Sequence, residues 1–187
     1  INKSSLKQNC VIILFIYLYN TMKPIEVNVL KVLDGDTLTI NYDHKIIKAR
    51  MRFIDAPEMK KPWESSDDPR VLQHWQWGIN AKSFLSSIIP KNNILYCYKY
   101  EKDIYERDLC DFYFSNVISQ ETSVQLSMCA SGMAAYFLPY QYYDFNSNRE
   151  LDLFLEVIRK CAIAKKKSIG FWKDDIILPY QIKNKRF

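Results

Sequence analysis

Three short segments near the start of the chain alternate between apolar and polar residues. Residues 25–33, 37–42 and 46–54 are rich in valine and isoleucine, and this pattern is typical of half-buried β-strands. Two polar breaks separate them: residues 34–36 (Asp-Gly-Asp) and residues 41–44 (Asn-Tyr-Asp-His), which favour tight reversals. The three segments are therefore predicted to form a meander of antiparallel strands.

The spacing becomes helical after residue 70. Between residues 71 and 89 apolar side chains recur at intervals of three and four, and Pro90 ends the run. Residues 65–68 (Ser-Ser-Asp-Asp) offer an N-cap just before this helix. The side chains predicted to share its buried face are Leu72, Trp75, Ile79, Phe84, Leu85 and Ile88.

Two more strands and two more helices follow. Residues 94–100 and 109–114 predict a hairpin, and residues 124–135 and 150–167 predict helices. Five strands with a helix between the third and the fourth is the order found in an OB-fold, a five-stranded, partly open Greek-key barrel. Since no repeat or low-complexity linker divides the chain, residues 22–187 are predicted to form one domain.

Residues 1–21 hold an apolar run of about ten residues behind two lysines, which matches the central region of a secretory signal. The run is short for a membrane span, and no small-residue cleavage site follows it. The alternative is an upstream extension or extra helix before a protein that starts near Met22. A signal predicts a secreted or periplasmic protein, with membrane contact only if the segment is retained, and an extension predicts an intracellular one.

Composition narrows the class of partner. The chain has 187 residues, enough for one domain with its own core, and its net charge of +5 favours a polyanionic partner. Its five cysteines show no spacing typical of a metal site, and most are predicted to be small buried residues. A disulfide between Cys97 and Cys110 is the alternative if their strands pair.

Acidic and basic residues that could do chemistry gather around the predicted meander. Asp36 begins one strand, and Asp55 ends another where Pro57 removes the N–H that a ladder needs. Carboxylates are hard oxygen donors of the kind that calcium prefers, and Glu58 adds a third one nearby. Arg50, on the same strand as Asp55, is the residue type that best binds a phosphate.

These residues resemble the motifs of the staphylococcal nuclease family, in order and spacing. The Val-x-Asp-Gly-Asp-Thr turn is residues 32–37, the strand end from arginine to Pro-Glu is residues 50–58, and the Tyr-Gly-Arg motif has become Tyr-Glu-Arg at residues 105–107. The resemblance continues at three later places: residues 77–78, 131–134 and 170–172. It implies an α+β, mainly β fold in which three helices pack against the five-stranded OB-fold barrel.

The resemblance implies Ca²⁺ as the cofactor. Asp36 and Asp55 match the carboxylates that bind the metal, and the main-chain carbonyl of Ala56 is expected to join them. A threonine is familiar at the position of Ala56, but a main-chain ligand tolerates alanine. Asp34 is expected to serve the turn rather than the metal.

The resemblance also implies the catalytic and substrate-binding residues. Arg50 and Arg107 match the two arginines that clamp the scissile phosphate, and Glu58 matches the glutamate that orients or deprotonates the attacking water. Tyr105 matches a tyrosine that hydrogen-bonds a substrate phosphate, and Tyr140 one that stacks near the sugar and base.

Some positions depart from the family pattern. Ile104 stands where a lysine or arginine is common, and Glu106 replaces the glycine of Tyr-Gly-Arg. Arg52 could add a phosphate contact, but pairing with a surface acid is the favoured expectation. His44 and His74 have no partners at metal-ligand spacing, so neither is assigned a catalytic role.

The function implied by the resemblance is a nuclease that cuts DNA and RNA with little sequence preference. It would favour single strands, leave 3′-phosphate ends and act as a monomer without a stable protein partner. One alternative is a binding module that keeps the fold but does not cut, although intact acids and arginines argue against it. Another is a structural domain tethered to a membrane by its apolar N-terminus, which predicts no metal dependence.

Overall fold

The protein is described by a computed structural model that covers residues 23–138, 145 and 147–183. The predictions for residues 1–21 and for Tyr140 lie outside these described residues. Among the residues covered, none of the helices is both long enough and apolar enough to cross a membrane.

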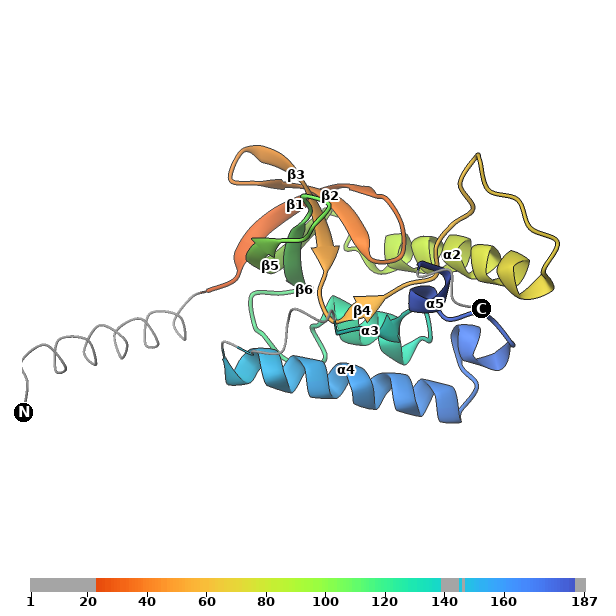
Figure 1. The fold of residues 1–187 in the computed structure, drawn as a ribbon. Helices are drawn as coiled ribbons and strands as arrows, with labels where there is room; N and C mark the ends of the chain where they lie inside the picture. Colours follow the sequence, from red (N-terminus) through yellow and green to blue (C-terminus); the bar gives the residue numbers. More distant parts are fainter. Residues whose placement is uncertain (1–22, 139–144, 146, 184–187) are drawn as a thin grey trace, which may run out of the picture.

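Five strands close into a barrel (Figure 1). Its strands are β1 (Ile25–Val32), β2 (Thr37–Tyr42), β3 (Lys45–Met51), β5 (Ile94–Lys102) and β6 (Asp108–Tyr113), in the spatial order β1-β2-β3-β6-β5. β3 and β6 pair in parallel, and the other barrel pairs are antiparallel. Closure removes the exposed edges that an open sheet would present. The predicted five-stranded barrel is confirmed.

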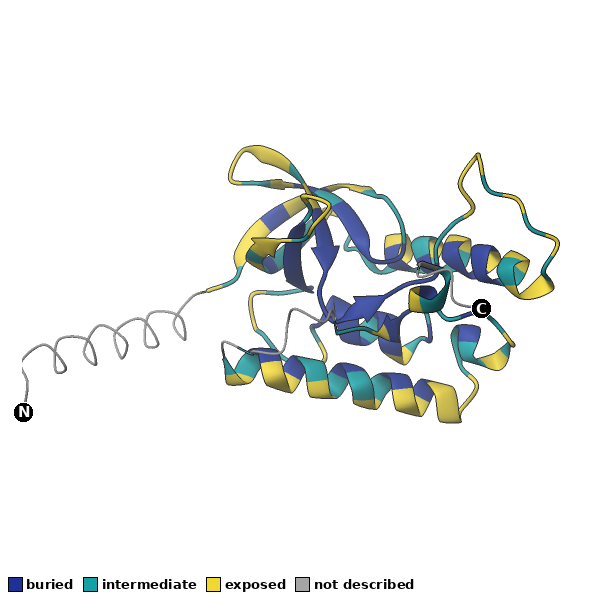
Figure 2. Cartoon of the chain, in the orientation of Figure 1, coloured by how far each residue is buried: buried dark blue, intermediate teal, exposed yellow. Residues whose placement is uncertain are grey.

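Alternate residues of these strands fill the barrel, as period-two patterning requires. Figure 2 shows the burial concentrated in the strands and along the helix faces turned toward them. Cys97 faces Phe112 across the β5–β6 pair, whereas Cys110 faces Lys99, so the two cysteines are not directly opposite. Both are buried free thiols, and the alternative of a disulfide is not realised.

The helices lie on one side of the barrel and extend beyond it (Figure 1). α3 (Val124–Ala130) contacts β6 and lies against α4 (Asn148–Lys166), while α2 (Pro69–Ile88) contacts β1 and α3. Two shorter elements, η1 (Gly170–Lys173) and α5 (Pro179–Lys183), follow α4. The expected N-cap of α2 is present, since the Asp68 carboxylate accepts the N–H of Arg70 at 2.8 Å.

Two predicted elements end early for reasons that the structure makes clear. The strand predicted over 46–54 stops at Met51, because Phe53 adopts a left-handed conformation with φ 64°. The chain then forms β4 (Ile54–Asp55), which pairs with β7 (Ala135–Tyr136) in a separate small sheet. The helix predicted over 124–135 likewise ends early, at Ala130, because Gly132 has φ 62°. The last predicted helical residue, Ala135, belongs to β7 instead.

Candidate active site

The turn at residues 34–36 places the first acidic residue of the site. The Asp34 carboxylate accepts the N–H of Asp36 at 3.0 Å, which closes the turn and agrees with the expected structural role of Asp34. The Asp36 carbonyl accepts the N–H of Met51 at 2.8 Å, so the turn is tied to the end of β3. A Cβ at Gly35 would lie 2.6 Å from the Ala56 side chain, and only glycine permits this approach.

Arg50 joins the two predicted metal-binding acids. Its guanidinium donates to Asp36 Oδ1 and to Asp55 Oδ1, each at 2.7 Å. Asp36, Asp55 and Arg50 are 3%, 1% and 7% exposed, so these contacts are largely shielded from water. The N–H of Ala56 donates to Asp36 Oδ2 at 3.0 Å. The structure therefore brings Asp36, Arg50, Asp55 and Ala56 together, although they come from the turn before β2, from β3, and from β4 and the residue after it.

Negative charge exceeds positive charge around this arginine. Burial, together with the nearby charges of Asp36 and Glu58, raises the pKa of Asp34 to about 7. Burial alone would lower the pKa of Arg50, but the charges of Asp36 and Asp55 outweigh it and hold the pKa above its ordinary value. Burial and the neighbouring acids therefore disfavour the ionised form of Asp34, whereas the acids beside Arg50 favour its charged form.

The donor set fits calcium in kind but supplies only part of a coordination shell. Across the described ranges, no three His, Cys, Asp or Glu side chains group closely enough to hold a metal ion. Asp36 and Asp55 offer hard oxygens, and Ca²⁺ takes about six to eight such ligands. Main-chain carbonyls, such as that of Ala56, and water would have to provide the rest.

Glu58 lies in the segment that leaves β4, and α2 holds its peptide group. Its N–H donates to Nε2 of His74 at 2.8 Å, and a Cβ at Gly78 would lie 2.4 Å from its carbonyl oxygen. His74 and Gly78 are one helical turn apart and face the same way. Sequence patterns missed His74, because no ligand-type partner lies near it along the chain.

Gly78 is expected to be essential for the position of Glu58. In Gly78→Ala the new methyl group would push the Glu58 peptide away from α2. Since a misplacement of about 1 Å can cost about 100-fold in rate, we expect kcat for DNA cleavage to fall at least about 10-fold. The measurement is steady-state cleavage of a single-stranded oligonucleotide, with thermal unfolding recorded in parallel.

A neighbouring residue of α2 serves as the control for Gly78. Ile79 is 49% exposed on the same helix, so Ile79→Ala changes the helix surface without moving Glu58. It should retain the wild-type kcat. A Gly78→Ala protein that folds and cleaves as fast as Ile79→Ala would show that α2 does not set the position of Glu58.

Arg107 lies just before β6, on the side of the sheet that carries Arg50. The register sets Leu109 opposite Arg50, and period-two alternation then places Arg107 on the same side. Arg107 donates through Nε to the Asp103 carboxylate at 2.8 Å. Its guanidinium also forms an ion pair with Asp103 through Nη2, at 2.6 Å.

The loop before Arg107 is open to solvent. Tyr105 is 73% exposed, and the Arg107 guanidinium lies 5.3 Å from the centre of its ring. Glu106, which replaces the family glycine, has φ 61°, in the left-handed region that glycine adopts most easily. Its carboxylate pairs with Lys102 at 3.0 Å. Glu106 therefore holds a backbone conformation that is uncommon for a residue with a side chain.

Arg52 was expected to pair with a surface acid, and this expectation is wrong, because its partners are buried. It donates to both oxygens of Asp111, at 3.0 and 2.8 Å, and to Glu150 at 3.0 Å. Its guanidinium also lies 3.3 Å from the centre of the Tyr100 ring. Since Glu150 belongs to α4, this cluster joins the helix to the barrel, and Arg52 is 8% exposed. Its contacts are structural.

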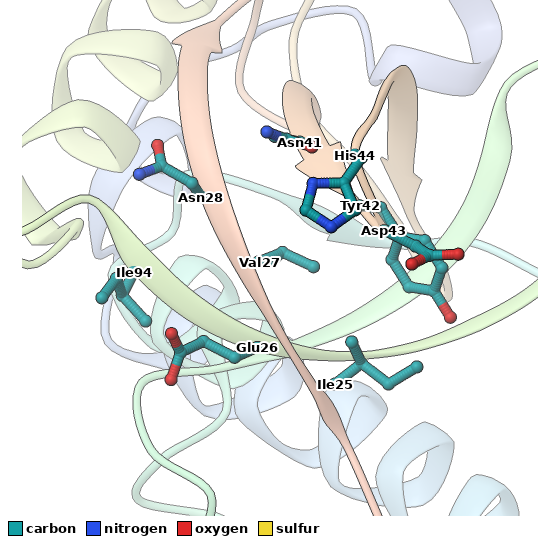
Figure 3. A pocket seen from close by; sticks show the side chains of 9 residues that line it. All are labelled: Ile25, Glu26, Val27, Asn28, Asn41, Tyr42, Asp43, His44 and Ile94. Atoms are coloured by element: carbon teal, nitrogen blue, oxygen red, sulfur yellow. The ribbon is translucent and has the colours of Figure 1, made fainter.

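A shallow hollow of about 470 Å³ lies at the opposite end of β2 from Asp36 (Figure 3). β1 and the β2–β3 turn line it, together with Ile94, and His44 of that turn points toward it. Its lining includes none of the predicted site residues. His44 therefore lies away from the acids of the candidate site.

Residues 48–174 match a known protein family. The model of the family described as staphylococcal nuclease homologue matches residues 48–174. The chain belongs to the staphylococcal nuclease homologue family. The match includes Arg50, Asp55, Glu58 and Arg107, whereas Asp36 precedes it and is tied to the site by its contacts with Arg50 and Ala56. The closed barrel with its packed helices is the fold expected of this nuclease-like family.

Two curated proteins resemble the chain over most of its length. A protein of Haemophilus influenzae named an uncharacterized endonuclease is 29% identical over 148 residues, which are 79% of this chain and 66% of that protein. An uncharacterized protein of Methanocaldococcus jannaschii is 28% identical over 158 residues, 77% of this chain and 70% of that protein. The chain thus spans about two thirds of the length of these relatives.

Proposed function

We propose that this protein is a calcium-dependent phosphodiesterase that hydrolyses DNA and RNA with low sequence specificity. The observation that carries the proposal is Arg50, which is buried between the carboxylates of Asp36 and Asp55 at 2.7 Å from each. Membership of the staphylococcal nuclease homologue family and the endonuclease name of the Haemophilus relative support it. We further propose a preference for single strands, 3′-phosphate products and a monomeric protein.

The arginines would bind the phosphodiester. A guanidinium presents its N–H groups in a fixed plane that matches two phosphate oxygens, and burial strengthens such contacts. Arg50 lies at the centre of the acid cluster, and Arg107 approaches from the start of β6 on the same side of the sheet. Positive charge from both would offset the negative charge that develops as water attacks phosphorus.

Glu58 would act on the attacking water. Its carboxylate would orient the water or accept its proton as the new bond to phosphorus forms and the bond to the 5′ oxygen breaks. Asp36 and Asp55, with the carbonyl of Ala56, would hold Ca²⁺, which polarises a phosphoryl oxygen and keeps the reactants close. An unpaired strand could bring its bases onto Tyr105 and onto Tyr140, which lies outside the described residues.

The test is digestion of single-stranded DNA and RNA with Ca²⁺ or with EGTA. We expect cleavage only with calcium, and Glu58→Ser should lower kcat by about 100-fold or more, because a positioned proton acceptor contributes about that much. The matched control is Glu26→Ser, an exposed acid on β1 that lines the hollow at the other end of β2. Cleavage that persists in EGTA, or in Glu58→Ser, would contradict the proposal.

The second candidate function is a nucleic-acid-binding module that no longer cuts. The Arg107–Asp103 ion pair favours it, since it engages the predicted phosphate clamp within its own loop. The strained backbone at Glu106 favours it as well. If the wild-type protein binds single-stranded DNA but leaves it intact with and without calcium, this candidate replaces the enzyme. Glu106→Gly would then be the first change to make in a search for restored cleavage.

A further inference from the structure

His74 is buried completely and makes two hydrogen bonds through its ring. Nε2 accepts the N–H of Glu58 at 2.8 Å, and Nδ1 lies 2.8 Å from the carbonyl oxygen of Ile177. A carbonyl can only accept, so Nδ1 carries the hydrogen and Nε2 presents a lone pair. His74 is therefore the neutral tautomer protonated at Nδ1, because this form satisfies both contacts at once.

The contact to Glu58 matters because no strand holds this residue. β4 ends at Asp55, and residues 56–61 continue without regular structure, so no sheet partner is available for the N–H of Glu58. A main-chain N–H that is partly shielded from water needs an acceptor, and His74 supplies one. The close approach of Gly78 to the Glu58 carbonyl restrains the other end of the same residue.

The second contact of His74 reaches the segment after η1. Ile177 accepts from His74, and the Asp174 carboxylate accepts from the indole N–H of Trp77 at 2.7 Å and from Gln73 at 2.9 Å. These three bonds fasten residues 174–177 along α2. One imidazole thus connects the C-terminal segment to the main chain of the proposed catalytic acid.

We propose that His74 is a positioning residue of the active site, which fixes the Glu58 peptide and thereby the place of its carboxylate relative to Asp36, Arg50 and Asp55. This inference rests on the proposed nuclease function. Because rate depends steeply on the placement of reacting groups, the loss of one such contact is expected to reduce kcat more than KM. Partners that hold a functional group in this way typically contribute about 10-fold to 100-fold.

Two substitutions separate the two hydrogen bonds of His74. The amide of glutamine takes the place of Nε2, so His74→Gln can still accept from Glu58. The shorter asparagine places its amide near Nδ1, so His74→Asn can still donate to Ile177 but does not reach Glu58. Both side chains are polar and smaller than histidine, and each keeps one of the two hydrogen bonds, so thermal unfolding of both variants is recorded beside the kinetics. His44→Asn is the control, since His44 is exposed and asparagine tolerates its left-handed backbone.

Cleavage of single-stranded DNA with calcium gives kcat and KM for each protein. We expect His74→Asn to lose about 10-fold to 100-fold in kcat with KM changed by less than about threefold, and His74→Gln to recover most of that loss. Equal kcat in the two variants, or a change in KM alone, would overturn the proposal. His44→Asn should match the wild-type protein.

A spectroscopic measurement tests the contact without cleavage. In ¹⁵N-labelled wild-type protein, a nitrogen–nitrogen coupling across the hydrogen bond should join the Glu58 amide to Nε2 of His74, and Nε2 should show the shift of an unprotonated nitrogen. Absence of the coupling overturns the proposal whatever the kinetics show. If the coupling is present but the wild-type protein never cuts, the proposed function has failed, and His74 is then a structural contact and not a positioning residue.

Discussion

Arg50→Lys is expected to lower the rate of DNA cleavage by at least about 100-fold, although the positive charge is kept. Lysine is a point charge on a flexible stem, so it cannot span Asp36 and Asp55 as the planar guanidinium does at 2.7 Å from each. It also cannot offer two parallel N–H groups to a phosphate. The measurement is kcat for a single-stranded oligonucleotide in saturating calcium.

The control for Arg50 comes from the same strand. Lys48 lies two residues earlier, on the same side of β3, and it is exposed. Lys48→Ala should change kcat by less than about twofold, since an exposed cation contributes little to the fixed geometry of a buried site. An Arg50→Lys protein that is folded and cleaves at the wild-type rate would rule out the guanidinium as the phosphate ligand.

Asp111→Ala is expected to give the largest loss of stability, about 3–5 kcal/mol in the free energy of unfolding. Asp111 is fully buried and accepts hydrogen bonds from Arg52, Arg149 and Tyr100. Removing it leaves the buried guanidinium of Arg52 and the half-buried one of Arg149 without a shared acceptor. Urea unfolding at pH 7 measures the loss, with Asp152→Ala on the exposed side of α4 as the control.

The same residue predicts how stability changes with pH. Burial alone would raise the pKa of Asp111, but the charges of Arg52 and Arg149 outweigh it, so the pKa lies below its ordinary value. An acid with a lowered folded-state pKa stabilises the protein above its unfolded pKa, and the benefit disappears as pH falls through the folded value. The stability gap between wild type and Asp111→Ala should therefore narrow in acid. A gap that stays constant from neutral pH to about pH 2 would contradict this account.

The barrel and the core of the site could be predicted because both depend on neighbours along the chain. Alternation specifies the strands, and the reversal at residues 43–44 sets Thr37 opposite Arg50 in the β2–β3 register. Pro57 ends the next strand just beyond Asp55. These local rules place Asp36, Arg50 and Asp55 at one end of the barrel before any tertiary contact is known.

The buried face of α2 could be predicted only in part: Trp75 and Leu85 are buried as expected, but two of the other predicted residues are not. Apolar spacing assigns Leu72 and Ile79 to it, yet they are 47% and 49% exposed. The face that packs carries His74, Gly78 and Ala81, whose small or polar side chains let the helix backbone approach the residues after β4. Apolar periodicity gives no weight to glycine or histidine. It therefore leaves the side of α2 that meets the residues after β4 out of the predicted buried face.

Arg52 shows the same limit at longer range. The favoured expectation for Arg52 was pairing with a surface acid, whereas its partners Asp111 and Glu150 are buried and lie 59 and 98 residues further along the chain. Only the folded arrangement of β6 and α4 reveals that the acids needed to neutralise it are buried beside it. The end of the strand before Phe53 could not be predicted from the sequence either, because an aromatic residue rarely adopts a positive φ.

The cluster of Arg52, Asp111, Arg149 and Glu150 balances two positive charges with two negative ones under the packed side of α4. Mobile ions screen buried pairs far less than exposed ones, so the attachment of α4 to the barrel should be nearly indifferent to ionic strength. A polyanion, by contrast, would be held through contacts that release counterions and weaken steeply as electrolyte is added. Concentrated salt would therefore detach substrate from a protein that remains fully folded.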